Sequence, residues 1–384
     1  NKAGGSDGNI CVVPVSSYPW NWDLEDCIEE YGEGEEAIAC ADEYGLLYGN
    51  SKINIEYYGQ ILEQYGIGQY TGIYIDPTIR EENRNPDLVE AAKTCSGFFF
   101  TGGDQSRGIY ALRDDNGKAS PVLKAIQKQI RKGALMAGTS AGTAIQTKRF
   151  VIANGNNPIA LIDGAGSTVY DNTERELIYE DGVCDGCDDL LYNRFQGVGN
   201  FKYGISDTHF SDRERTLRLL RLLADTRRNF GFGVDTATSL SVDQGFMTVI
   251  GLDGVTILDL RRARVDRRSK YFGIRGVRIS YIRPGDSYDA NRRRFYMGGS
   301  PIEEQDTAEI VNNDIMDELD TDGFQMVSLL SDLAKSTRKV ARGYSDSTAP
   351  QYRVTLRKGW RTKTAIQDGN VSVANVWMAV EALE

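Results

Sequence analysis

The 384-residue sequence contains a single histidine, His209. Metal sites that need several histidines are therefore excluded, and any catalysis by an imidazole must use this one residue. Proline (9), methionine (6) and tryptophan (4) are also scarce. No apolar run approaches the roughly 18 residues of a membrane-spanning helix, so we expect no membrane partner. We also expect neither a metal nor another cofactor.

Basic side chains are outnumbered, with 44 Lys and Arg against 55 Asp and Glu and a net charge of -11. This balance argues against a nucleic-acid partner, which would need many phosphate contacts. The imbalance is uneven: residues 1–200 hold 30 acidic and 16 basic side chains, whereas residues 201–384 hold 25 and 28. A solvated acidic face is the simpler explanation, and head-to-tail contacts between copies are the alternative.

The cysteines are even in number: Cys11, Cys27, Cys40, Cys95, Cys184 and Cys187. Such a count fits up to three disulfides in an oxidising compartment, with 15 pairings left open. Since no second ligand pair accompanies Cys184 and Cys187, they predict a disulfide-stapled surface loop rather than a zinc site. The sequence begins at Asn1 without a methionine, and we expect a processed, secreted protein.

Two kinds of pattern alternate in the first 140 residues. Strands are predicted by short β-branched or aromatic runs at residues 10–15, 72–76, 97–100 and 134–137. Helices are predicted between them at residues 54–64, 86–93 and 121–132. Continuous apolar runs suit a parallel sheet that is covered on both faces. The alternation predicts a doubly wound, flavodoxin-like α/β fold with a mostly parallel sheet and helices on both faces.

The pattern changes after residue 228 to apolar runs separated by Gly, Asp and Pro. Antiparallel strands that complete the sheet are predicted at residues 246–250, 255–260 and 277–282. We expect an α/β domain over residues 1–296, with a C-terminal extension over residues 297–384 packed on it. Within the extension, a helix is predicted near residues 326–334 and strands near residues 352–356 and 371–377.

A basic cluster follows the second of these antiparallel strands and comprises Arg261, Arg262, Arg264, Arg267, Arg268 and Lys270. It is typical of a site for an acidic partner or of a proteolytic site. A solvated, partly salt-bridged hairpin accounts for it equally well.

The first candidate catalytic segment is residues 138–142 (GTSAG), directly after the strand predicted at 134–137. In the pattern G-x-S-x-G, the glycines permit a sharp strand-to-helix turn. That turn places a serine oxygen outside the sheet, beside backbone N–H groups. Ser140 is therefore the candidate nucleophile, and Ala141 is a candidate oxyanion donor.

A second glycine-rich turn, residues 101–105 (TGGDQ), also follows an apolar strand. Turns at the ends of neighbouring strands meet at one crevice in an open α/β sheet. We expect Gly103 to supply the other oxyanion donor, and Asp104 and Gln105 to contact the substrate.

His209 belongs to residues 207–218 (DTHFSDRERTLR), which lead into an apolar helix predicted at residues 217–223. The imidazole can act as the base for Ser140. Arg213, Arg215 and Arg218 follow it closely. Clustered guanidinium groups either grip carboxylates or form buried ion pairs.

Together these segments resemble the cyanophycinase and peptidase E family of serine peptidases. The matching motifs, in order, are FFTGGDQ at 99–105, GTSAG at 138–142, DTHFSDRERTLR at 207–218, GFGVD at 231–235 and PGDSYD at 284–289. The resemblance implies a class I glutamine-amidotransferase-like fold, with Ser140 as nucleophile and His209 as base. It implies hydrolysis beside an aspartate of a β-Asp-Arg polymer. The substrate contacts that it implies are Gly103, Asp104, Gln105, Asp207, Thr208, Arg213, Arg215 and Arg218.

The sequence departs from this family in three places. A glutamate that orients the histidine follows the fourth motif in cyanophycinases, and here that position is Thr236. Loss of the orienting carboxylate costs about 10⁴ in turnover in the serine-protease template, so we expect weakened or lost catalysis. Asp207 and Asp235 are the candidate replacements for that orienting carboxylate. Thr208 stands where the family has a glutamine.

The third departure is at the start of the sequence, where residues 1–17 align with the second strand of the family. The first strand, with its Gly-Gly turn, is expected to be missing. A sheet that lacks a strand exposes an edge that another chain can fill.

Two hypotheses follow from these observations. The retained serine, histidine and arginines favour a secreted hydrolase whose partner is a peptide substrate. Thr236, the missing strand, the charge asymmetry and the 20 tyrosines favour an inactive homologue. In that case the chain would be an extracellular structural protein that assembles with itself into homo-oligomers or filaments.

Overall fold

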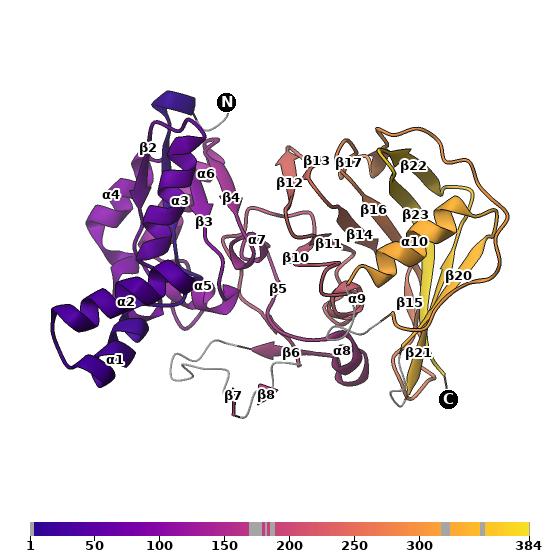
Figure 1. Cartoon of the computed structure of the whole chain (residues 1–384), viewed down its shortest axis with the longest axis horizontal. Coiled ribbons are helices and arrows are strands. Elements are labelled where there is room, and N and C mark those ends of the chain that lie inside the picture. The colour runs from indigo at the N-terminus through magenta and orange to yellow at the C-terminus, as the bar shows by residue number, and fades with distance from the viewer. Residues whose placement is uncertain are drawn as a thin grey trace. The chain divides into compact units, whose positions relative to one another are not determined.

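The structure is a computed structural model that describes residues 4–168, 179–180, 183–184, 189–315, 323–345 and 350–383. The chain forms two compact units (Figure 1). The first contains residues 1–153, 167–177 and 193–202, and the second contains residues 154–166, 178–192 and 203–384. No helix among the described residues is long and apolar enough to cross a membrane.

A four-stranded parallel sheet forms the centre of the first unit, in the order β2-β1-β3-β4. Its strands are β1 (Asn9–Val13), β2 (Gln69–Gly72), β3 (Gly97–Phe100) and β4 (Leu135–Gly138). All five residues of β1 are buried, as an apolar strand covered on both faces requires. The predicted doubly wound α/β fold is therefore confirmed.

The second strand is displaced from its predicted position at residues 72–76. Ile73 and Ile75 are fully buried, but β2 ends at Gly72. The side chain of Asp76 accepts from the Thr78 backbone N–H at 2.8 Å and begins the 3-10 segment η2 (Pro77–Arg84). A proline cannot donate to a ladder, so the apolar run ends in a cap instead of continuing as a strand.

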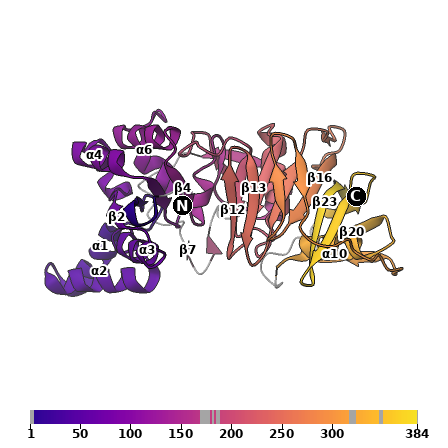
Figure 2. The same cartoon turned by 90° about the horizontal axis from the view of Figure 1, so that it is seen from above.

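Helices cover both faces of this sheet (Figure 2). Figure 2 shows α4 (Pro86–Thr94) and α6 (Pro121–Arg131) on one side, and α3 (Ile53–Gln64) on the other. Ser120 caps α6 by accepting from the Leu123 N–H at 3.1 Å, as the sequence predicts. The other helices of the unit are α1 (Trp20–Tyr31), α2 (Glu35–Tyr48), α5 (Gln105–Leu112) and α7 (Ala141–Ala144), with the 3-10 turn η1 (Gly5–Asp7).

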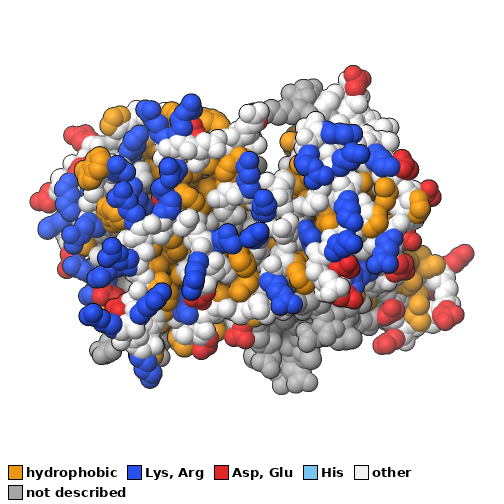
Figure 3. Space-filling view, turned by 180° about the vertical axis from the view of Figure 1, so that it is seen from behind, with side chains coloured by type: hydrophobic (Ala, Val, Ile, Leu, Met, Phe, Trp, Pro, Cys, Tyr) orange, Lys and Arg blue, Asp and Glu red, His pale blue; other side chains and the backbone are white. Residues whose placement is uncertain are grey.

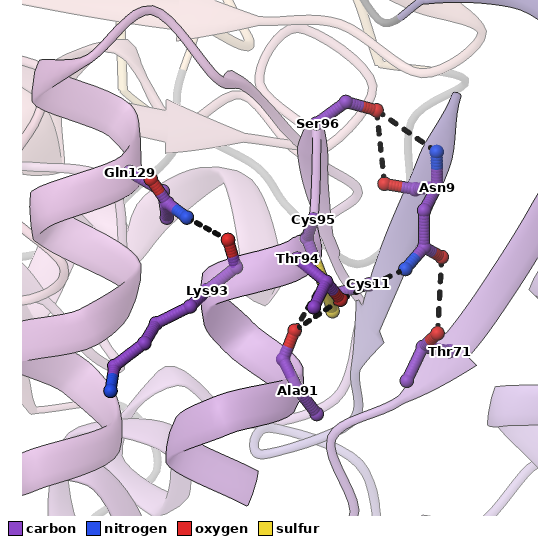
Figure 4. The surroundings of a disulfide bond; sticks show 9 residues. All are labelled: Asn9, Cys11, Thr71, Ala91, Lys93, Thr94, Cys95, Ser96 and Gln129. Atoms are coloured by element: carbon purple, nitrogen blue, oxygen red, sulfur yellow. Dashed lines mark hydrogen bonds between the residues drawn. A yellow bond between two sulfur atoms is a disulfide. The ribbon is translucent and has the colours of Figure 1, made fainter. Parts of the chain in front are cut away.

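Two disulfides connect elements of the first unit. Cys11 on β1 is bonded to Cys95, the residue that ends α4, and Cys27 on α1 is bonded to Cys40 on α2. Figure 4 shows the first of them beside hydrogen bonds of Asn9 that join the same two segments. The predicted staple of Cys184 with Cys187 involves a residue outside the described part of the chain.

The second unit begins with a parallel pair, β10 (Ile205–Thr208) and β11 (Phe230–Val234). Its sheet continues with mostly antiparallel strands: β14 (Val255–Asp259), β16 (Ile274–Ile282), β23 (Asn370–Leu383), β21 (Gln351–Arg357), β20 (Val340–Tyr344) and β19 (Ile310–Asn312). Along its margins lie β15 (Arg264–Val265) and β22 (Lys363–Gln367). The strands predicted at residues 255–260 and 277–282 correspond to β14 and β16 of this sheet, whereas the strand predicted at residues 246–250 belongs to a separate sheet. The expectation that these strands complete the parallel sheet of the first unit is wrong, because they pair with other strands of the second unit.

A second antiparallel sheet in this unit has the order β12-β13-β17-β18. Its strands are β12 (Thr238–Asp243), β13 (Phe246–Gly251), β17 (Ser287–Asp289) and β18 (Arg294–Tyr296). The helices are α8 (Asn157–Asp163), α9 (Thr216–Asp225) and α10 (Gln325–Lys335). Short strands elsewhere in the chain are β5 (Val151–Ile152), β6 (Ala165–Thr168), β7 (Tyr179–Glu180), β8 (Val183–Cys184) and β9 (Leu190–Asn193).

The C-terminal residues share the main sheet of the second unit, because β23 pairs along β16 in an antiparallel register. The predicted helix and strands of this region correspond to α10, β21 and β23. The boundary at residue 296 stays a prediction about domain organisation.

The two disulfides close loops of different length, with sequence separations of 84 and 13 residues. The chain-entropy model assigns about 4–5 kcal/mol to the longer loop and about 3 kcal/mol to the shorter. We therefore expect urea unfolding to show a larger loss of unfolding free energy for Cys11→Ala with Cys95→Ala than for Cys27→Ala with Cys40→Ala. A larger loss in the second double variant would contradict this ranking.

Candidate active site

Ser140 occupies the turn between β4 and α7, as the sequence predicts. Its backbone angles are φ 48° and ψ -119°, a conformation that L-residues with side chains rarely adopt. Its carbonyl oxygen accepts from the N–H groups of Thr143 at 2.8 Å and Ala144 at 3.1 Å, which holds the strained residue in place. A sharp, strained turn of this kind is the geometry of a nucleophile elbow.

The two glycines of this motif are required by close backbone packing. A Cβ atom on Gly142 would lie 2.1 Å from the Phe100 carbonyl oxygen, and one on Gly138 would lie 2.3 Å from the Gly142 carbonyl oxygen. Both distances are shorter than any real contact. Close backbone packing in the β4–α7 turn therefore explains both glycines of the motif.

The second glycine-rich turn lies next to the first. A Cβ atom on Gly102 would be 3.4 Å from the Ser140 Cβ, which is ordinary contact. Gly103 has φ 122°, and its own Cβ would lie 1.9 Å from the Ser16 carbonyl oxygen, so only glycine fits there. The structure thus brings the predicted turns at residues 101–105 and 138–142 together within the first unit. The oxyanion roles of Gly103 and Ala141 stay predictions.

Asp104 and Gln105 both bond to backbone in the structure. The carboxylate of Asp104 caps α5 by accepting from the Ser106 N–H at 2.6 Å. The amide nitrogen of Gln105 donates to the carbonyl oxygens of Ile152 at 2.6 Å and Ala153 at 3.1 Å. These contacts position the glycine-rich turn. Contact of either side chain with a substrate stays a prediction.

His209 follows β10 in the second unit, also with a positive φ, 47°. Its Nδ1 atom lies 3.3 Å from the Thr236 Oγ1 and 3.7 Å from the Asp212 Oδ2. Thr236 therefore lies beside the imidazole, where the resemblance locates the acid of the family. A carboxylate is also present, from a residue that the sequence did not single out.

Asp212 is ionised over the whole physiological pH range. Partial burial raises the pKa of its carboxyl group, but the interactions with His209 and Thr236 outweigh the burial and lower that pKa to about 2. Its Oδ1 atom is buried and has no hydrogen-bond partner. The fixed negative charge beside Nδ1 favours the ring orientation that points Nδ1–H toward Asp212.

The two aspartates considered as substitutes from the sequence have other partners. Asp235 accepts from the N–H groups of Ser211 at 2.9 Å and Gly254 at 3.2 Å, and from the Tyr281 hydroxyl at 2.7 Å. Burial raises its pKa to about 6, against these hydrogen bonds. Asp235 thereby fixes the backbone next to His209 and does not contact the ring through any bond that the structure shows.

Asp207 is buried and forms a bidentate ion pair with Arg218, at 3.0 Å from Nε and 2.8 Å from Nη2. Burial opposes ionisation, but the charges of Arg218 and Arg215 outweigh it and lower the pKa of Asp207. Arg215 donates to the Thr208 carbonyl oxygen at 2.7 Å. Arg213, in contrast, is exposed.

The arginines thus divide by their surroundings. Arg215 and Arg218 hold the segment that carries His209. The sequence left open whether these arginines bind a ligand carboxylate or form buried ion pairs, and Arg218 forms a buried ion pair. Arg213 is exposed to solvent, where a ligand carboxylate can reach it.

Ser140 belongs to the first unit and His209 to the second, and their joint action stays a prediction from the order of the motifs.

The chain is similar in sequence to known cyanophycinases. No family model matches the chain. It is 30% identical over 204 residues to the cyanophycinase of Nostoc sp. and, equally, to that of Trichormus variabilis, covering 53% of this chain and 57% of each relative. The cyanophycinase of Geminocystis herdmanii is 25% identical over 222 residues, covering 56% of this chain and 70% of the relative. The chain thus spans little more than half the length of the first two, and the resemblance predicted from the motifs is confirmed.

Two solved structures show a loose similarity in shape. One is a peptidase from an acI-B1 actinobacterium, with a TM-score of 0.40, 16% identity, and coverage of 73% of this chain and 83% of that one. The other is a protein assigned to peptidase E from Listeria monocytogenes, with a TM-score of 0.33, 11% identity, and coverage of 66% and 88%.

The raised pKa of Asp235 predicts an unusual dependence of stability on pH. Its carboxyl group ionises near pH 4 in the unfolded chain and near pH 6 in the folded chain. The folded state therefore binds more protons in this window, and we expect its free energy of unfolding to fall by about 2 kcal/mol as pH rises from 4 to 6.

Urea unfolding at several pH values checks this expectation, with Asp235→Asn as the comparison, since an amide keeps the shape but does not titrate. The variant should show a smaller decline over the same window. An identical decline in both proteins would mean that another group causes it.

Proposed function

Because the chain is related by sequence to the cyanophycinase and peptidase E family of serine peptidases, we propose that it is a serine-type hydrolase for peptide bonds beside aspartyl residues. Ser140 is the nucleophile, His209 is the general base, and Asp212 takes the role of the missing family acid. The observation that carries this proposal is the 3.7 Å distance between the Asp212 Oδ2 and the His209 Nδ1.

In this proposal the Ser140 oxygen attacks the carbonyl carbon of the scissile bond, while His209 accepts the hydroxyl proton through Nε2. The tetrahedral intermediate carries its negative charge on the former carbonyl oxygen, which the N–H groups of Gly103 and Ala141 stabilise. The C–N bond then breaks as the imidazolium returns the proton to the leaving amine. Water hydrolyses the resulting ester by the same steps and restores Ser140.

The carboxylate matters because the imidazole carries a positive charge during both steps. Asp212 stabilises that charge and fixes the ring so that Nε2 is the basic nitrogen. A distance of 3.7 Å is longer than a hydrogen bond, but catalytic contacts are often long before a substrate binds. Thr236 Oγ1, at 3.3 Å from the same Nδ1, supplies a second oxygen beside the ring.

The proposed substrate is a β-aspartyl or Asp-Arg peptide, the class that cyanophycin represents. The exposed guanidinium of Arg213 follows the base closely in sequence and suits the free carboxylate of such an aspartyl group. Because Arg215 and Arg218 are bonded to Thr208 and Asp207, Arg213 is the member of the cluster that we assign to the substrate.

We further propose that the protein works outside the cytoplasm. Its two disulfides, Cys11–Cys95 and Cys27–Cys40, support an oxidising compartment. The alternative hypothesis, an inactive homologue that assembles with itself, predicts no turnover. The assay below therefore decides between the two.

The test measures kcat/KM on cyanophycin and on β-aspartyl-arginine. We expect turnover by the wild-type chain and loss of turnover in Ser140→Ala. In Asp212→Asn we expect kcat/KM to fall 10²-fold to 10⁴-fold, since loss of the orienting aspartate in a serine protease lowers turnover by about 10⁴. Asp266→Asn, which changes an exposed aspartate in the hairpin between β15 and β16, should leave kcat/KM unchanged.

Adding Thr236→Glu to Asp212→Asn should restore activity, because it returns a carboxylate to the family position. Absence of wild-type turnover on both substrates would overturn the enzymatic proposal. Full activity of Asp212→Asn would overturn the role of Asp212 alone.

A further inference from the structure

A cavity of about 550 Å³ lies within the second unit and does not include Ser140 or His209. Strands β14, β16, β17, β18 and β23 and the start of β22 contribute its walls. Its volume is in the range that holds small organic molecules. Seven cationic side chains line it, and a single carboxylate, Asp259.

The positive charges of this cavity are mostly unneutralised. Asp259 is bonded to Arg261 at 2.6 Å, so the one lining carboxylate is already used. Arg292 pairs with Asp289 at 3.1 Å. The other five cations, Arg278, Arg293, Arg294, Arg361 and Lys363, form no ion pair among the described residues. Figure 3 shows Lys and Arg side chains gathered over this unit, with fewer acidic ones between them.

Arg278 lines the cavity and is held there by the sheet. It stands opposite Asp259 on β14 and Trp377 on β23, and its guanidinium packs 4.4 Å from the Trp377 ring. Its Nε atom is buried and has no hydrogen-bond partner. Burial and the neighbouring charges of Arg262 and Arg361 lower its pKa, as expected where like charges crowd without compensation.

A smaller compartment of about 70 Å³ opens from the same wall, lined by Arg261, Arg262, Arg278, Arg361 and Asp259. All of these except Arg262 also line the larger cavity. Since one water takes about 30 Å³ in the liquid, this space suits a single tetrahedral oxyanion surrounded by guanidinium groups.

The rim of the cavity carries an aromatic ring. Trp360 is 86% exposed, although a tryptophan costs more than most residues to leave in water. The guanidinium of Arg361 lies 4.4 Å from its ring and keeps one face occupied. The ring can pack against a sugar or base that enters the cavity while an anionic group occupies the small compartment.

We propose that this arginine-lined cavity binds a small organic polyanion that carries phosphate or sulfate ester groups. Guanidinium forks match the oxygens of both groups in pairs, which a lysine does not. A long nucleic acid is disfavoured by the net charge of -11 and by a site that is a cavity rather than an open face. The basic cluster at residues 261–270 is therefore divided between the two predicted roles. Arg261 and Arg262 line the proposed anion site, whereas Arg267 lies on the exposed hairpin.

The experiment measures binding of sodium tripolyphosphate and of sucrose octasulfate to the full chain by calorimetry in 150 mM NaCl. We expect at least one of them to bind, and a loss of affinity of at least tenfold in Arg278→Met, which keeps the contact with Trp377. Binding of tripolyphosphate alone identifies phosphate chemistry as the source, and binding of sucrose octasulfate alone identifies sulfate chemistry.

Two further variants separate the cavity from the general field of the surface. Arg361→Ala, on an exposed segment, should also weaken binding tenfold, and its thermal unfolding should match that of the wild type. Arg267→Ala, which removes one positive charge outside the cavity, should change affinity less than twofold. Absence of binding by both probes, or equal losses in the Arg267 and Arg361 variants, would overturn the proposal.

Discussion

The buried ion pair between Asp207 and Arg218 connects the end of β10 to the first turns of α9, and the only histidine of the chain lies between them in sequence. Burying two charges is costly unless every oxygen and N–H group has a partner. Here Arg218 also donates to the Gly155 carbonyl oxygen at 2.8 Å, and Arg215 donates to the Thr208 carbonyl oxygen. These contacts hold His209 in a strained, positive-φ conformation from which its ring reaches both Thr236 and Asp212.

The same segment also connects the C-terminal residues to this framework. Glu214 is buried, and its carboxylate accepts from the N–H groups of Gln325 and of Met326, the latter at 3.3 Å, at the start of α10. A carboxylate at a helix N-terminus interacts favourably with the helix dipole. The role of residues beyond 296 therefore includes support for the turn that carries the candidate base.

The sequence predicted the parallel sheet well because buried strands leave continuous apolar runs such as residues 97–100, and because caps such as Ser120 mark helix starts. It also located Ser140 and the glycine-rich turns, whose glycines are fixed by backbone packing. It missed Asp212, since a contact three residues away in a left-handed turn has no sequence signature. The arginine-lined cavity could not be predicted from the sequence either. Asp259 and Arg278 become neighbours only through the pairing of β14 with β16, and Arg361 joins them because the segment before β22 lies beside β23.

The most direct test of the central claim, that Ser140 is activated by His209, is labelling with a serine-directed fluorophosphonate followed by peptide mass spectrometry. We expect the wild-type chain to be modified at Ser140, at a rate that falls at least 100-fold in His209→Ala. Labelling of the wild type that is absent, or that proceeds equally fast in His209→Ala, would contradict that claim.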